Sequence, residues 1–243
     1  MLQRLLLSGI LSGLIVGAFV TMIHLTMVTP IILEAETYES KSEPAIAAHS
    51  HAVGTPAHSH AEEAWAPEDG LERSLYTLAA NLVMAVGFGL LLAAAYTISG
   101  RAFGWRTGVT WGLACYLCFS FLPALGLPPE LPGSAAADLG ARQVWWIATV
   151  AASICGLASL VFNPTPWVKA AGIVLLIAPH VIGAPHPVGG ETGSVPPELA
   201  AHFVIVTMFM NAAMWIALGV ATAYFFARFS DTGERGQIVD IRA

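Results

Sequence analysis

The chain has 243 residues, of which 56% are apolar and only 11% charged, and its formal net charge at pH 7 is -6. Soluble globular proteins carry about a quarter charged residues, so this composition excludes an ordinary soluble enzyme. The long apolar stretches exclude a disordered chain, and the acidic balance argues against a nucleic-acid partner. We therefore expect most of the chain to lie in a lipid bilayer.

Six windows of the sequence lack Asp, Glu, Lys and Arg and have the length of about 20 residues that a helix needs to cross a membrane. In chain order they are Leu5–Leu33, Ser74–Gly100, Thr107–Pro129, Gln143–Val168, Ala170–Gly190 and Leu199–Ala227. They predict an all-α, polytopic bundle of six spanning helices that forms one membrane domain over residues 1–243. Five spans are the alternative, because the fifth window is short and rich in proline, and it can be partial or re-entrant.

The first window resembles a signal peptide only at its start, where Arg4 precedes an apolar run. The run is about twice as long as a signal peptide allows, and no small-residue cleavage motif follows it before Glu34. We interpret it as a retained helix that ends at Thr29 and Pro30. Glu34, Glu36 and Glu39 then lie at the mouth of this helix.

Small and polar residues recur along this first helix at intervals of four, four, four and three. They are Gly9, Gly13, Gly17, Thr21 and His24. Such spacing places them on one stripe, and small residues on a stripe mark close contact between membrane helices. His24 is therefore expected to face the bundle, where a polar side chain finds partners.

Residues 34–73 are rich in Ala, Pro, Glu, Ser and His, and we expect a flexible loop outside the membrane. The motif HSH occurs twice in it, and contributes His49, His51, His58 and His60. Neutral imidazole is a common ligand of divalent transition metals, so the loop can collect such ions with low affinity. The alternative is a polar linker whose histidines have no role.

The third window holds Cys115 and Cys118, which we interpret as apolar filler because burial disfavours the reactive thiolate. No nucleotide-binding, GxSxG or HExxH motif occurs in the sequence. The chain is therefore predicted not to be an enzyme and not to hydrolyse ATP.

The last two windows carry the remaining histidines. His180 and His186 lie in IAPHVIGAPHPVGG, where prolines prevent a regular helix, so this segment must be buried in protein or line a wet cavity. His202 lies near the start of the sixth window. On an ideal helix Asn211 lies on the face opposite His202, together with Met208 and Trp215. There Asn211 either lines a surface other than the histidine site or serves only in helix packing.

The distribution of charge predicts the orientation of the helices. If Arg4 is cytoplasmic, seven of the ten basic residues lie inside and thirteen of the sixteen acidic residues outside. Both termini are then cytoplasmic, with residues 229–243 as a short cytoplasmic tail. All eight histidines fall at or beyond the outer part of the membrane.

This one-sided arrangement favours a metal-entry site at the outer mouth of the bundle. Its candidate ligands are His24, His180, His202, His186, Glu34 and Glu36. Taken singly, each histidine is better explained as a hydrogen-bonded residue of the membrane interface. As a set they favour a bound cation.

The sequence resembles the CbtA family of predicted cobalt transporter subunits over nearly its whole length. The segments that carry the resemblance are LLLSGILSGLIVGAFVTMIHLTMVTPIILEAETYE, PHVIGAPHPVGG and PPELAAHFVIVTMFMNAAMWIALG. It implies a bacterial inner-membrane protein associated with cobalamin synthesis and with a small, one-helix, histidine-containing partner, CbtB. The family pattern would extend to His24, Pro30, Glu34, Glu36, His180, Pro185 and His202.

These observations predict uptake of a divalent transition metal from the outer side, with Co²⁺ as the transported ion and Ni²⁺ as an alternative. No permanent cofactor is expected, and a homo-oligomer is compatible with the sequence. A second hypothesis is a non-conducting metal-binding or assembly subunit, because the inner half of the windows has no acid, base or histidine. A membrane enzyme with a histidine-bound metal is a third, which no base or nucleophile in the sequence supports.

Overall fold

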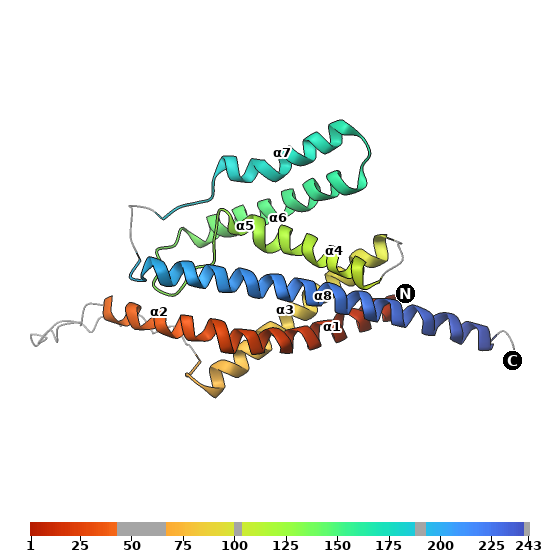
Figure 1. Ribbon diagram of the computed structural model, residues 1–243, viewed down its shortest axis with the longest axis horizontal. Coiled ribbons are helices and arrows are strands. Elements are labelled where there is room, and N and C mark those ends of the chain that lie inside the picture. The colour runs from red at the N-terminus through yellow and green to blue at the C-terminus, as the bar shows by residue number, and fades with distance from the viewer. Residues whose placement is uncertain (43–66, 100–103, 188–192, 241–243) are drawn as a thin grey trace, which may run out of the picture.

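The computed structural model describes residues 1–42, 67–99, 104–187 and 193–240, and within them the side chains of residues 40–42 and 230–240 are left aside. Every secondary-structure element in these residues is helical, and the helices run antiparallel in one elongated bundle (Figure 1). The predicted all-α membrane bundle is confirmed. The HSH histidines lie outside the described residues.

The elements follow the predicted order. They are α1 (Leu2–Ile23), the π-helical turn η1 (His24–Val28), α2 (Thr29–Ser42), α3 (Leu71–Ser99), α4 (Trp105–Tyr116), the π-helical turn η2 (Leu117–Phe121), α5 (Leu122–Ala124), α6 (Leu139–Phe162), α7 (Pro166–Ile182) and α8 (Pro197–Asp240). Five helical segments are long and apolar enough to cross a membrane: Leu2–Glu39, Leu71–Ser99, Trp105–Ala124, Leu139–Phe162 and Pro197–Phe229.

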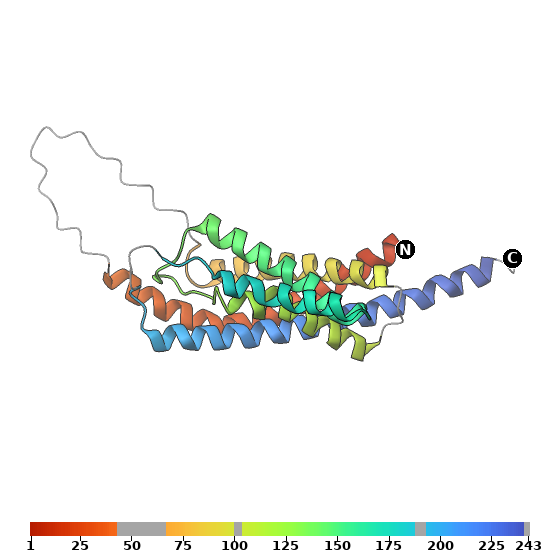
Figure 2. The same cartoon turned by 90° about the horizontal axis from the view of Figure 1, so that it is seen from above.

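The predicted fifth span is α7, which is apolar but has only 17 residues. At 1.5 Å per residue it is about 26 Å long, somewhat shorter than the hydrocarbon core of about 30 Å. It runs antiparallel to α6 at the edge of the bundle (Figures 1 and 2). The length of α7 therefore leaves five full spans and one shorter apolar helix among the described residues.

The two ends of the bundle differ in what they carry. We call the end at which α2 ends and α3, α6 and α8 begin the loop end, and the opposite end, which holds Met1, the terminal end. The carboxyl end of α8 lies at the terminal end with Met1 (Figures 1 and 2). Met1 and the carboxyl end of α8 thus lie at the same end of the bundle.

The prediction that the first helix ends at Thr29 and Pro30 is wrong. The helix continues to Ser42 through η1, in which the Thr29 N–H donates to the His24 carbonyl, five residues back. Proline has no N–H, and its ring clashes with the carbonyl four residues earlier in an α-helix, so a wider π turn accommodates it. A π turn precedes a proline a second time in the chain, because η2 ends at Phe121, two residues before Pro123.

The structure also differs from the sequence prediction in the boundaries of two other segments. The loop expected over residues 34–73 is helical at both flanks, to Ser42 and from Leu71. The window Gln143–Val168 is divided, because α6 ends at Phe162 before Pro164 and α7 begins at Pro166. Proline removes the backbone donor that a continuing helix would need.

Close helix contact at the predicted stripe is confirmed. A Cβ atom built on Gly9 would lie 2.8 Å from the Leu90 Cα atom, and one on Gly17 would lie 2.9 Å from the Leu82 Cα atom. Only glycine lets the backbones of α1 and α3 approach this closely. The helix α8 completes the core, where Trp215 and Leu218 are buried beside Tyr96 of α3.

Candidate metal site at the loop end

His24 is the first residue of η1 and continues the stripe of α1 that faces α3. One turn earlier, the Thr21 hydroxyl accepts a hydrogen bond of 3.2 Å from the Asn81 side-chain amide of α3. The His24 side chain is half-buried, and its Nδ1 atom is enclosed with no hydrogen-bond partner among the described residues. A π turn within a helix often marks a functional position, so this nitrogen is a strong candidate ligand.

His180 is the second enclosed imidazole. It lies near the end of α7, half-buried beside Trp145 of α6, and the two ring centroids are 6.0 Å apart in an edge-to-face arrangement. The His180 Nε2 and Trp145 Nε1 atoms are both buried without a partner in the described part of the chain. The helix α7 then ends at Gly183, whose φ of 89° favours glycine.

The other candidate ligands of the described chain lie on its surface. Glu34, His186 and His202 are exposed. Among the described residues, no three His, Cys, Asp or Glu side chains come close enough to hold a metal ion together. The structure therefore places two separate enclosed imidazoles and several exposed groups at the loop end, without joining them in one coordination sphere.

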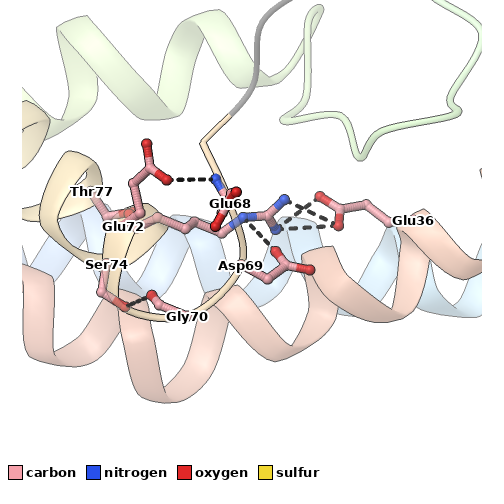
Figure 3. A network of polar contacts seen from close by, with 8 residues as sticks. Glu36, Glu68, Asp69, Gly70, Glu72, Ser74 and Thr77 are labelled. Carbon is pink, nitrogen blue, oxygen red and sulfur yellow. Dashed lines mark hydrogen bonds and ion pairs between the residues drawn. The ribbon is translucent and has the colours of Figure 1, made fainter.

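Glu36 is engaged by a residue that the sequence did not single out. The Arg73 guanidinium donates to both carboxylate oxygens of Glu36, at 3.0 and 3.2 Å from Nη1, and also pairs with Asp69 at 3.1 Å (Figure 3). These contacts join the end of α2 to the start of α3. A cation that binds the Glu36 carboxylate must therefore compete with Arg73.

Sequence reasoning also missed Asn81 and Trp145. Asn81 could have been found, because it is the only side-chain amide in the window Ser74–Gly100, and an intramembrane amide calls for a partner. Trp145 could not, because its contact with His180 depends on which helices are neighbours.

The terminal half of the bundle holds a seam of buried hydroxyl groups. Ser8, Ser12 and Thr222 are fully buried, and the Ser12 and Thr222 hydroxyl oxygens are 2.9 Å apart. The seam ends at Arg4, whose Nε–H donates to the Phe226 carbonyl at 2.7 Å. These groups hold α1 against α8 with their hydrogen bonds made inside the protein.

Within the described residues, the loop end can therefore contact a cation at single nitrogen atoms, but it does not enclose one. A tightly held transition ion such as structural zinc has four protein ligands. One imidazole offers one bond, and water or further protein groups must supply the rest. Such an arrangement suits passing contact with a mobile ion better than permanent storage.

A family model described as "Probable cobalt transporter subunit (CbtA)" matches residues 2–227. The matched stretch begins at the first residue of α1 and ends within α8, so it covers α1 to α7 and the first 31 of the 44 residues of α8. No curated protein and no solved structure is significantly similar to the chain.

Proposed function

The chain belongs to the CbtA family, described as a probable cobalt transporter subunit, and from this premise we propose that it takes up Co²⁺ across the bacterial inner membrane to supply cobalamin synthesis. The observation that carries the proposal is the Nδ1 atom of His24, which is enclosed in a π turn of a spanning helix and has no hydrogen-bond partner in the described part of the chain. A polar atom in that position needs a partner, and a transported cation can be one.

The proposed path begins at the loop end, and the charge distribution of the sequence supports a periplasmic position for it. The acidic and histidine-rich loop with His49, His51, His58 and His60 concentrates the ion. The exposed Glu34, His186 and His202 meet it next. His24 and His180 then replace part of its water shell, and Glu36 contributes once Arg73 has been displaced.

Nickel is the alternative cargo. Affinities of nitrogen and oxygen ligands rise only gradually from Co²⁺ to Ni²⁺, so the ligand types do not separate the two ions. Uptake of labelled cobalt in the presence of excess nickel distinguishes them. Cobalt uptake that survives a tenfold excess of nickel supports the cobalt proposal.

A second candidate is a non-conducting subunit that delivers metal to a partner. The word subunit in the family description favours it, and so does the terminal half, where Ser8, Ser12 and Thr222 are closely packed. A small one-helix, histidine-containing protein of the CbtB kind is the proposed partner. A homo-oligomer is also compatible with this role.

The test compares cobalt uptake by cells that carry His24→Ala, His180→Ala or His202→Ala with uptake after deletion of residues 45–62. We expect His24→Ala and His180→Ala to lower uptake about tenfold and the exposed His202→Ala to lower it less. Deletion of the loop should matter chiefly at low cobalt concentration, because it removes a collector. Each variant is compared at equal amounts of membrane-inserted protein.

Normal uptake in all three point variants would remove the loop-end site from the mechanism. Loss of uptake only after the deletion would move the metal chemistry to the loop.

A further inference from the structure

An apolar groove of about 740 Å³ lies in the loop-end half of the bundle, between α3, α5, α6 and α8. Its floor is aromatic, since the ring centroid of Trp215 is 4.6 Å from that of Phe88 and 5.3 Å from that of Phe119. Asn211 and Met208 line its wall, so the face of α8 opposite His202 borders this groove. None of the metal-site histidines lines this groove.

The groove opens sideways, toward the surface that a spanning bundle presents to lipid. Side chains at its rim are strongly exposed although they are apolar: Met84 is 53%, Ile147 61% and Leu139 64% exposed. In a bilayer these positions face acyl chains rather than water. An occupant can therefore enter from the membrane without crossing an aqueous boundary.

The end of the groove nearest the loop end is charged. Arg142 in the first turn of α6 pairs with Glu130 at 2.6 Å, and the side chains are 28% and 27% exposed, respectively. The two groups present a positive and a negative charge side by side at the level where α6 begins. This pattern complements a zwitterionic headgroup that carries a phosphate and an ammonium group.

The size of the groove indicates whether a membrane helix or a smaller molecule can occupy it. It extends from Leu139 to Ile147 along α6, about 12 Å at 1.5 Å per residue. A membrane helix 30 Å long and 10 Å wide has a volume of about 2,400 Å³, more than three times that of the groove. A volume of 740 Å³ lies instead within the range of about 300–1,000 Å³ typical of small-molecule sites.

We propose that this groove binds a phospholipid whose headgroup carries a phosphate and a primary ammonium. One acyl chain lies on the Phe88, Phe119 and Trp215 floor, the phosphate is held by Arg142, and the ammonium is held by Glu130. The proposal is independent of metal transport, because it rests on residues outside the histidine site.

The test uses the full-length protein, purified in detergent and stripped of native lipid. Phosphatidylethanolamine, which has both charges, and phosphatidylglycerol, which lacks the ammonium, are titrated separately, and bound lipid is counted by native mass spectrometry. We expect one phosphatidylethanolamine per chain, bound at least fivefold more tightly than phosphatidylglycerol. Arg142→Gln should weaken this binding about tenfold.

A matched pair of variants tests the position of the acyl chain. Ala124 lines the groove, and Ala124→Phe fills it, whereas Ala170→Phe adds the same bulk on an exposed position of α7 outside the groove. Ala124→Phe should reduce lipid binding at least tenfold, and Ala170→Phe should leave it unchanged. Equal binding by the two variants overturns the proposal.

Charge exchange gives a second readout that does not depend on Ala124→Phe folding. Glu130→Arg and Arg142→Glu should each lower phosphatidylethanolamine binding, and the double variant, which restores the ion pair, should recover most of it. Equal affinity for both lipids, or an Ile147→Cys variant that crosslinks two chains through the groove, would contradict a lipid site.

Discussion

At the scale of single residues, Arg73 decides how much of the negative charge at the mouth of the first helix is available to a cation. It holds the Glu36 carboxylate and also pairs with Asp69, and its side chain is 24% exposed. Ion pairs near the protein surface contribute about 1 kcal/mol or less to stability, so removing this part-buried pair should leave the fold intact.

We therefore predict that Arg73→Gln raises cobalt uptake at low cobalt concentration about two- to threefold, because the Glu36 carboxylate becomes free to bind the ion. Glu36→Gln is the matched variant of the other partner, and it should lower uptake. Initial uptake rates measured against cobalt concentration test both. Lower uptake in Arg73→Gln would assign the ion pair a purely structural role.

Glycines provide a residue-scale test of the packing. A Cβ atom on Gly13 would collide with the backbone of Val86, whereas one on Gly87 meets nothing within 4 Å. We predict that Gly13→Ala destabilises the protein by about 1–3 kcal/mol through overpacking. Gly87→Ala should be neutral or stabilising by up to about 1 kcal/mol, since alanine favours helix.

Thermal unfolding in detergent compares these two variants directly. Equal melting temperatures for Gly13→Ala and Gly87→Ala would show that α1 and α3 are not in close contact.

At the scale of helices, much of the arrangement could be predicted from sequence. The four-residue spacing of Gly9, Gly13 and Gly17 predicted a contact stripe, and that stripe meets α3. The continuation of the first helix through Pro30 could not be predicted, because proline usually indicates a helix end and nothing local reveals a π turn. The separation of the histidines could not be predicted either, because it depends on which helices are neighbours.

Compared with a regular α-helix, the π turn η1 contains one extra residue. Removing one residue from this turn therefore tests whether η1 is an insertion. We predict that deletion of Thr26, an exposed residue, combined with Pro30→Ala converts η1 to regular α-helix and keeps α1 and α2 in register. Stability should stay within about 1 kcal/mol of the parent, the range of ordinary exposed substitutions. Cobalt uptake should fall, because the surroundings of His24 change.

Deletion of Ile15 is the control, since it removes an exposed residue from regular α-helix. It rotates one part of α1 by about 100° against the other and moves glycines off α3, so it should destabilise the protein strongly. Thermal unfolding and cobalt uptake are measured on both deletions. Comparable loss of stability in the two would mean that η1 is not an insertion.

At the scale of the whole molecule, the candidate metal ligands among the described residues lie toward one end of a bundle whose other end is closely packed. Binding by imidazole requires the neutral form, which is present above the ordinary imidazole pKa of about 6.5 and is lost below it. We therefore predict that cobalt uptake by cells falls several-fold between pH 7.5 and 5.5. Unchanged uptake over this range would argue against collection of the ion by the loop histidines His49, His51, His58 and His60.

The most direct test of the central claim is cobalt flux into liposomes that contain only this chain, followed with a metal-sensitive dye inside. We predict a cobalt flux above that of empty liposomes. The His24→Ala variant should reduce this flux about tenfold, whereas the packing control Gly87→Ala should retain it. Absence of flux from correctly inserted protein, with flux restored by a small histidine-containing membrane partner, would contradict conduction by this chain alone.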